Sequence, residues 1–404
     1  MARKTKNVAE KVNKQIKKSE VESLVKRLVS TPSHCETPTR EKEVAELLNE
    51  FLVDEGVRSR LRKVEKNRSN VVAVIKGTTG RGRSLMLNGH TDTVPPHAKD
   101  VRAFKPRISS GKLYGRGALD MKGGLGAMAI ATVAMERARV PLQADLVFAA
   151  VVGEEGKSEG TEDIVLKGPK TDFAIVGEPT GLEIQPSHRG LEWLEVHVRG
   201  KAAHGGQADK GVNAISMAAR FINKVEDELL PKLASRSSRH TLPPTLNLGV
   251  VTGGQQPSSV ADECIVRIDR RWIPEESLEQ VFQEIYDVFD SVRDDHPEFR
   301  AELRRDMANM KTMTHVPNVV RKSSRLVRTL DEAVKANTGR KAKITTFWGW
   351  TDAALLTHFA KTPAVVFGPG GAGAHARNEY VKTNDLITCA KVYASAAMAT
   401  CRAE

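Results

Sequence analysis

Two hydrophobic patterns alternate through the first part of the chain. Residues 20–29 and 40–56 carry apolar side chains at helical spacing, and the second stretch ends at Gly56, a natural helix stop. Residues 118–137 predict a third helix, whose glycines and alanines allow it to pack closely on a sheet. Between these stretches lie four nearly continuous apolar runs of the kind found in strands buried on both faces, VVAVIKG, SLMLNGH, DLVFAAVVG and DFAIVGE. Together these elements predict an α/β domain.

The pattern changes after residues 187–190. LEWLEVHVRG alternates like a half-exposed strand, and the elements that follow predict a β-α-β-β-α-β order, typical of a ferredoxin-like α+β domain. The earlier rhythm then returns in SRLVRTLDEAVKANTG, KITTFWGW, DAALLTHFA, AVVFGPGG and a final helix from Thr383. We therefore predict a discontinuous mixed-sheet domain of residues 1–188 and 310–404, interrupted by an inserted domain of residues 189–309.

Length and composition fit this organisation. The chain has 404 residues, of which 40% are hydrophobic, and this size favours two domains over a single core. No apolar stretch approaches the roughly 18–20 residues of a membrane span. The basic N-terminus, MARKTKNVAEKVNKQIKKSE, lacks an apolar core and a cleavage site, so it predicts a solvated extension leading into the first helix and not a secretory signal.

The cysteines and the net charge indicate the cellular compartment and limit the classes of partner that are expected. Four scattered cysteines without a Cys-x-x-Cys pair exclude a zinc ribbon and favour a reducing, cytoplasmic location. The net charge of +12 is spread along the chain, without an RNA-binding aromatic motif or a helix-turn-helix pattern, so no nucleic-acid or membrane partner is expected. A basic surface can still draw anionic substrates towards a site.

The candidate chemistry lies where apolar runs end. Open α/β sheets bind ligands outside the carboxyl ends of their strands, and here those ends carry imidazoles and carboxylates. Such a set without thiolates suits zinc, cobalt or manganese in a hydrolytic role. Adjacent glutamates are usually solvated, but the run VFAAVV leaves no solvated helix for this pair, and buried acids need a neutralising partner. The residues concerned are His90, Asp92, Asp120, Glu154, Glu155, Glu178 and His375.

Six motifs resemble those of the zinc aminoacylase/carboxypeptidase family, which contains acetylornithine deacetylase, succinyl-diaminopimelate desuccinylase and carboxypeptidase G. They are GHTDTVPP, GRGALDMKGG, GEEG, GEPT, KAAHGG and GPGGAGAHARNEYV, and the resemblance runs from about residue 20 to the end. It implies a metallopeptidase-like catalytic domain with an inserted lid and dimerisation domain. It also implies two metal ions, one held by His90, Asp120 and Glu178, the other by Asp120, Glu155 and His375.

The resemblance also implies roles for residues beside the metals. Glu154 would be the general base that takes a proton from water and passes it to the leaving nitrogen. Asp92 would orient the imidazole of His90, which the alternation of a continuing strand would allow. His204, otherwise an ordinary loop histidine beside two glycines, would reach the active site of the other subunit and stabilise the oxyanion.

Three further residues are expected to bind substrate. Asn247 and Arg271 look like the positions that bind a substrate carboxylate, although Arg270 or Arg271 could equally be surface charge on a strand. Arg189 is a weaker candidate for the same task. Gly370 would offer a backbone group near the substrate, or would simply be a turn glycine.

The leading hypothesis is a homodimeric two-metal amidohydrolase that removes an acetyl or succinyl group from an amino acid, with zinc as the expected metal and cobalt or manganese as alternatives. A metallopeptidase that cleaves dipeptides or C-terminal residues would use the same site, because both bonds are amides. A catalytically inactive binding protein of the same fold is a third hypothesis, against which the complete ligand set argues. The acyl group and the amino acid stay open, because they depend on loops without a readable code.

Overall fold

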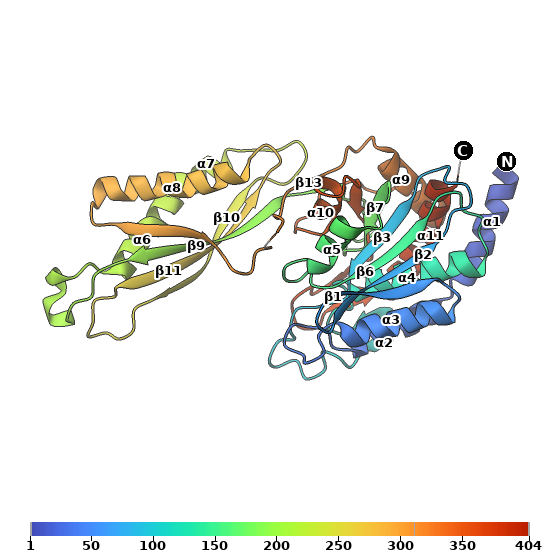
Figure 1. Cartoon of the computed structure of the whole chain (residues 1–404), viewed down its shortest axis with the longest axis horizontal. Helices are drawn as coiled ribbons and strands as arrows, with labels where there is room; N and C mark the ends of the chain where they lie inside the picture. The colour runs from blue at the N-terminus through green and yellow to red at the C-terminus, as the bar shows by residue number, and fades with distance from the viewer. Residues whose placement is uncertain (1, 311, 403–404) are drawn as a thin grey trace. The chain divides into compact units, whose positions relative to one another are not determined.

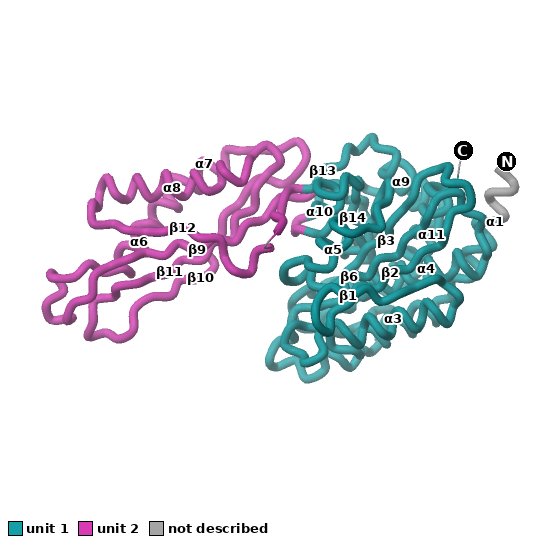
Figure 2. The backbone as a smooth tube through the Cα atoms, viewed as in Figure 1, with its two compact units in different colours: residues 1–187, 318–347, 351–404 teal, residues 188–317, 348–350 magenta. Residues whose placement is uncertain are grey.

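The computed structural model describes residues 2–310 and 312–402, and the chain forms two compact units (Figure 2). Unit 1 comprises residues 1–187, 318–347 and 351–404, and unit 2 comprises residues 188–317 and 348–350. The chain thus leaves unit 1 after residue 187, forms most of unit 2 and then returns to unit 1. The short strands β8 (Ser187–His188) and β13 (Asn318–Val319) mark where it leaves and re-enters unit 1.

The return to unit 1 comes later than the expected boundary at residue 310. The peptide N–H of Leu191 donates to the carbonyl of His315, and the His315 ring lies edge-on to the Trp350 ring at 4.6 Å. Trp350 Nε1 donates in turn to the carbonyl of Val316. These contacts keep residues 310–317 and 348–350 in unit 2. KITTFWGW forms no strand, but isolated pairing holds it, with a bridge between Ile184 and Ile344 and a bond from the Phe347 N–H to the Ser187 carbonyl.

Unit 1 is built on a six-stranded mixed sheet of order β1-β2-β6-β3-β7-β14. Strands β6, β3, β7 and β14 run parallel, while β1 and β2 are antiparallel to each other and β2 is antiparallel to β6. The central strands therefore end at one edge of the sheet. The bounds are β1 Ser59–Glu65, β2 Arg68–Ile75, β3 Leu85–His90, β6 Leu146–Val151, β7 Phe173–Val176 and β14 Ala364–Val366.

Both faces of this sheet are buried, which explains the nearly continuous apolar runs. Leu87 and Phe148 belong to a large core shared with helices, while their neighbours Met86 and Val147, on the opposite face, are only 1% exposed. Helix α4 packs on β3 and β6 and against α2 and α11, whereas α10 contacts α5, β7 and β14 (Figure 1). The helices are α1 Ala2–Gln15, α2 Lys18–Ser30, α3 Lys42–Asp54, α4 Lys122–Arg137, α5 Glu159–Lys167, α9 Arg325–Thr338, α10 Ala353–His358 and α11 Thr383–Cys401.

Two helix expectations need correction. The N-terminal residues form helix α1, and Val12 is fully buried in the core, so this segment is not a solvated extension. The helix expected from residue 118 begins instead at Lys122, because residues 117–120 form a loop held by hydrogen bonds to Glu379.

A second, smaller sheet in unit 1 joins distant parts of the chain. Its order is β15-β16-β5-β4, with bounds β4 Arg107–Ser109, β5 Lys112–Tyr114, β15 Gly371–Ala372 and β16 Tyr380–Lys382. Pairing of Leu113 with Val381 aligns the segment before Asp120 with the segment after His375. This sheet is what brings the two ends of unit 1 together at the site.

Unit 2 has the predicted β-α-β-β-α-β order and an antiparallel sheet of order β10-β11-β9-β12. Its helices cover one face through a core that includes Phe221, Phe289 and Phe299, whose rings meet edge to face. The bounds are β9 Gly190–Arg199, η1 Gly205–Lys210, α6 Ala214–Lys224, η2 Val225–Leu229, α7 Leu230–Ala234, β10 Thr245–Gly253, β11 Glu263–Trp272, α8 Leu278–Asp295 and β12 Arg300–Arg305.

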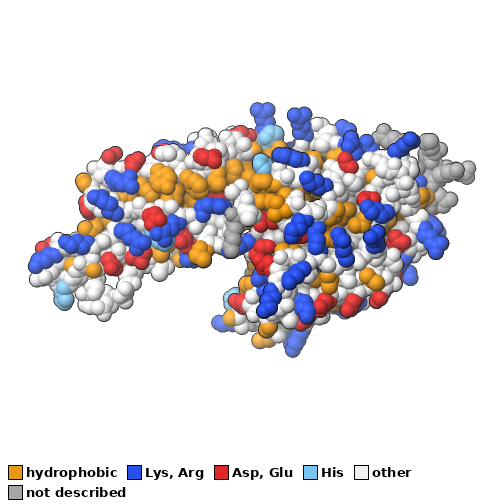
Figure 3. Space-filling view, in the orientation of Figure 1, with side chains coloured by type: hydrophobic (Ala, Val, Ile, Leu, Met, Phe, Trp, Pro, Cys, Tyr) orange, Lys and Arg blue, Asp and Glu red, His pale blue; other side chains and the backbone are white. Residues whose placement is uncertain are grey.

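The surface carries the basic excess in a dispersed form. On the face shown in Figure 3, Lys and Arg side chains lie over both units, interspersed with acidic ones. Within residues 2–310 and 312–402, none of the helices combines the length and the apolarity that crossing a bilayer requires.

Candidate metal centre

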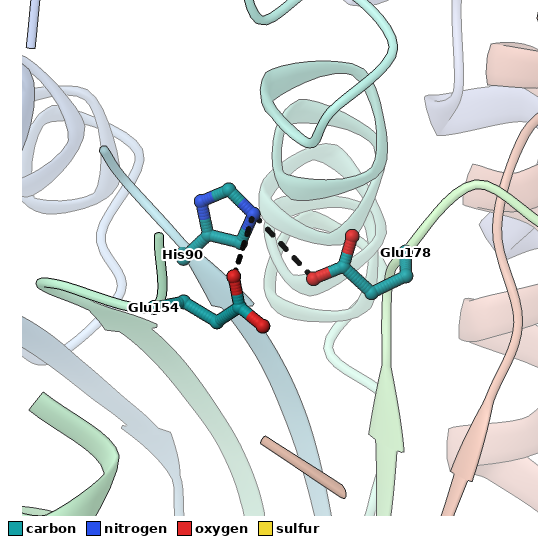
Figure 4. Close-up of side chains that lie close together, drawn as sticks. All are labelled: His90, Glu154 and Glu178. Carbon is teal, nitrogen blue, oxygen red and sulfur yellow. Dashed lines mark ion pairs between the residues drawn. The ribbon is translucent and has the colours of Figure 1, made fainter. Parts of the chain in front are cut away.

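Three parallel strands deliver the first part of the site. Strand β3 ends at His90, the turn after β6 carries Glu154 and Glu155, and Glu178 follows β7. His90 is 1% and Glu178 is 4% exposed. His90 Nε2 lies 3.4 Å from Glu178 Oε1 and 3.9 Å from Glu154 Oε2. Dashed lines mark these two ion pairs in Figure 4. The parallel register therefore brings these side chains together at one edge of the sheet, where the sequence places the ends of apolar runs.

Asp120 and His375 complete the cluster from the loops of the smaller sheet. Asp120 Oδ1 lies 3.3 Å from His90 Nε2, while its other oxygen lies 3.1 Å from His375 Nε2. His375 Nε2 is also 2.9 Å from Glu155 Oε1. The carboxylate of Asp120 thus stands between the two imidazoles, with one oxygen facing each.

The loop of Asp120 is held by Glu379, a residue that sequence reasoning missed. The Glu379 carboxylate accepts the peptide N–H groups of Gly117, Leu119 and Asp120 and pairs with Arg116 Nη1 at 2.7 Å. Arg116 and Glu379 are 3% and 2% exposed. In the sequence, the only sign of this pair is the arginine in the motif GRGALD and the glutamate in the motif ARNEY.

Asp92 holds the turn that carries the two glutamates. Its carboxylate accepts the N–H groups of Gly153 at 2.9 Å, Glu154 at 3.3 Å and Glu155 at 3.0 Å. Its contact with His90 is mainly through the backbone, because His90 Nδ1 lies 3.0 Å from the Asp92 carbonyl oxygen and 3.5 Å from Oδ1. The expected strand alternation does not reach Asp92, since β3 ends at His90. Nε2 of His90 is left facing the carboxylates.

A second residue missed by sequence reasoning is Asp352, which is 1% exposed. It precedes helix α10 and looks like an N-cap, but its side chain makes no capping bond and instead accepts a hydrogen bond of 2.6 Å from the Thr161 hydroxyl. Burial raises the pKa of Asp352 to about 6. It adds another acid to a region already rich in them.

The electrostatics of the cluster favour added positive charge. Burial raises the pKa values of Glu154 and Glu178 well above their usual range, and that of Glu155 as well. Hydrogen bonds to Asp120 and Glu155 raise the pKa of His375 to about 10. The acids outnumber the two imidazoles, so without further cations some of them must hold protons.

The side chains present fit divalent cations. Ligand atoms of His90, Asp120 and Glu155 lie within 4.8 Å of one another, and so do those of His90, Glu154 and Glu178. Glu178 Oε1 is buried without a hydrogen-bond donor among the described residues. Imidazole nitrogens and carboxylate oxygens without thiolates are ligands of zinc, cobalt and manganese.

The remaining predicted residues are distributed over both units. Unit 2 carries His204, whose exposed ring accepts the Gly206 N–H at Nδ1, and Asn247, exposed on β10. Arg271 makes a bidentate ion pair with Asp269, with distances of 2.7 and 2.8 Å. Arg189, the weaker candidate, donates to the Pro243 carbonyl within the same unit.

Arg270 and Gly370 have surroundings that differ from those expected from the sequence. Arg270 is not surface charge, because it is fully buried with Glu276 and Glu284. In unit 1, the N–H of Gly370 donates to Asp385 Oδ2 and its carbonyl accepts from the Lys382 N–H. A substrate would therefore have to compete for the backbone groups of Gly370.

Comparison with known proteins identifies the family. A family profile described as Peptidase family M20/M25/M40 matches residues 86–399, and the chain belongs to this family. Acetylornithine deacetylase of Myxococcus xanthus is 33% identical over 87% of each chain. Metal-dependent hydrolysis of amide bonds is the activity of this protein class, and the chain is such a hydrolase.

Solved structures share the fold over almost the whole chain. A Staphylococcus aureus tripeptidase superposes with a TM-score of 0.80 at 22% identity, covering 96% of this chain and 99% of that one. The Bacillus subtilis YXEP protein, described as a dinuclear metal-binding peptidase of the M20 family, gives a TM-score of 0.70 at 16% identity, covering 95% and 98%. These likenesses show that the fold, with one unit inserted in the other, is shared with known structures.

Proposed function

We propose that the protein removes an N-acyl group, acetyl or succinyl, from an amino acid. The observation that carries this proposal is the cluster in which Asp120 stands between the buried His90 and the more exposed His375, each within 3.3 Å. The 33% identity to a deacetylase favours an acyl-amino acid over a peptide. A metallopeptidase that cleaves dipeptides or C-terminal residues is the second candidate, in line with the shared fold of a tripeptidase structure.

The same cluster supports two divalent ions per subunit, with zinc first and cobalt or manganese as alternatives. His90, Asp120 and Glu178 would hold one, and Asp120, Glu155 and His375 would hold the other, with Asp120 shared. When bound, such ions lower the pKa of a shared water and polarise the scissile carbonyl. The two-ion assignment agrees with the description of the B. subtilis structure as dinuclear.

The protein's own residues would then move the proton. Glu154 lies in the cluster next in sequence to Glu155, and its buried carboxylate has a raised pKa that suits a general base. It would take the proton of the attacking water and give it to the leaving nitrogen. Asp92 would act as a positioning residue, because it fixes the backbone of Glu154 and Glu155.

The decisive experiment is a screen of N-acetyl, N-succinyl and N-formyl amino acids and of dipeptides with the metal-reconstituted enzyme. Glu154→Gln should lower turnover of the best substrate by about 10²–10⁴-fold while metal content is unchanged. Glu36→Gln, at an exposed glutamate of unit 1, is the control and should leave turnover unchanged. Near-full activity of a metal-loaded Glu154→Gln variant would remove Glu154 from the base role, and hydrolysis of dipeptides alone would favour the second candidate.

We further propose a homodimer formed through unit 2, in which His204 completes the site of the other subunit. Its Nδ1 accepts the Gly206 N–H, so in the neutral ring Nε2 carries the proton that an oxyanion could accept. Asn247 and Arg271, also on unit 2, would bind the substrate carboxylate.

Subunit mixing tests the role of His204. His204→Ala alone should lower turnover by about 10²–10³-fold without loss of metal. A mixture of His204→Ala and Glu154→Gln subunits should regain activity, because some sites would combine both intact residues. No recovery in a mixture shown to exchange subunits, or a strictly monomeric protein, would contradict the shared site.

A further inference from the structure

A basic pocket lies in unit 1 beside the metal centre, and the function proposed above assigns no role to the residues that line it. It has a volume of about 240 Å³, and it is formed by two loops, residues 99–107 and 376–379, together with residues 114–116. Ala376, directly after His375 in sequence, is part of its wall. The pocket therefore begins one residue from the candidate ligand His375.

The pocket is held together by contacts between its loops. Arg116 donates from Nη2 to the carbonyl of Ala376 at 3.2 Å, and its N–H donates to the carbonyl of Ala103 at 2.8 Å. Arg377 Nη2 reaches the carbonyl of Lys99 at 3.4 Å. These bonds cross from one loop to the other, so the walls are fixed without a ligand.

The charge of the lining is strongly unbalanced. Six cationic and two acidic side chains face the pocket, which leaves a net charge of +4 when two is subtracted from six. The acids are Glu379, already paired with Arg116, and Asp100, which accepts the Arg102 N–H. No ion pair neutralises Lys99, Arg102, Lys105 or Arg377 within the described residues.

Arg116, which lines the pocket, also carries a buried donor without an acceptor. Arg116 is 3% exposed, and its two terminal nitrogens bond Glu379 and Ala376. Its Nε–H is buried and has no acceptor among the described residues. An unsatisfied buried donor carries a free-energy cost.

We infer that this pocket binds a small oxyanion, a carboxylate or a phosphate. The cations of the two loops that have no ion-pair partner among the described residues neutralise its charge. The pocket is also linked to the metal centre through Glu379. This residue pairs with Arg116 and accepts the N–H of Asp120. The anion can be a free metabolite or a charged group of the substrate itself.

Calorimetric titration of the metal-loaded protein with inorganic phosphate tests the site independently of catalysis. Lys99→Gln/Lys105→Gln removes two exposed charges of the pocket and should weaken phosphate binding about fivefold to tenfold. The control Lys63→Gln/Lys66→Gln removes the same charge from exposed positions outside the pocket and should change it less than twofold. Equal affinity of both variants, or no phosphate binding by the wild type, would overturn the inference.

A kinetic arm distinguishes the two sources of the anion. If the substrate supplies it, phosphate should compete with an N-succinyl amino acid but not with its N-butanoyl analogue, and the pocket variant should lose the preference for succinyl. If a free anion supplies it, phosphate should change turnover of both substrates alike. Loss of all hydrolysis would count against the proposed function while leaving the binding result intact.

Discussion

Two buried charge clusters, one in each unit, are built on opposite principles. In unit 2, Arg270 is fully buried and its guanidinium bonds Glu276 at 2.8 Å and Glu284 at 3.0 Å, with Arg236 pairing the same two carboxylates. In unit 1, Glu154 and Glu178 meet only the imidazole of His90 among the described basic side chains. One cluster is neutralised by the chain itself, and the other is not.

The difference indicates which of the two clusters only supports the fold and which one can bind a ligand. Buried charges that are fully paired cost little more to keep than an apolar core, but a cluster with surplus acid is stable only when protons or cations enter it. The surplus of acid at His90 is therefore the feature that draws protons or cations into the site. Fully paired clusters such as that of Arg270 need none.

Breaking the paired cluster should have the larger effect on stability. Arg270→Met leaves Glu276 and Glu284 with Arg236 alone and should lower the free energy of unfolding of unit 2 by about 3–5 kcal/mol, measured by denaturant unfolding. Arg267→Met on the same strand is the matched control, because the Arg267 side chain is 55% exposed and its loss should cost about 1 kcal/mol or less. Equal losses would show that burial of the pair is not what matters.

Removing one surplus acid should have a smaller effect of the opposite sign. Burial raises the folded-state pKa of Glu178 above its unfolded value, so the ionised form lowers stability above the unfolded pKa. Glu178→Gln should therefore stabilise the metal-free protein at pH 7 to 8, and the gain should vanish as the pH falls towards 4, where the glutamate is protonated in both states.

Metal addition should reverse that gain. The wild type should be stabilised by zinc more than the Glu178→Gln variant, because the variant lacks one candidate ligand. Thermal unfolding of both proteins, with and without metal at neutral and acidic pH, gives the stability of each protein under the four conditions. A metal-free variant less stable than the wild type at pH 8 would show that the carboxylate is needed for the fold and not only for a cation.

Much of the candidate site could be predicted because its signals are local. An apolar run followed at once by a histidine or an acid marks a strand end, and parallel strand ends meet at one sheet edge. His90, Glu154 and Glu178 were found in this way, and the structure brings their side chains within 3.9 Å of Nε2 of His90. The ferredoxin-like unit was likewise predicted from its order of strands and helices.

The residues that were missed act through partners far away in sequence. Glu379 bonds the Asp120 N–H across 259 positions, and Asp352 bonds Thr161 across 191. In sequence the first is a loop glutamate and the second resembles a helix cap, so neither stands out. The boundary near residue 310 was misplaced for the same reason, because the contacts of His315 with Leu191 and Trp350 cannot be read from a local pattern.

The pairing of β5 with β16 has a consequence for the order in which the protein is made. His375 bonds Glu155 across 220 residues, and Glu379 reaches back across 259 residues to the N–H of Asp120. During synthesis, unit 2 is complete before either residue leaves the ribosome, while the acids of unit 1 wait without their second histidine. The nascent chain thus carries a half-built centre, which is complete only when the last strand of the smaller sheet has been made.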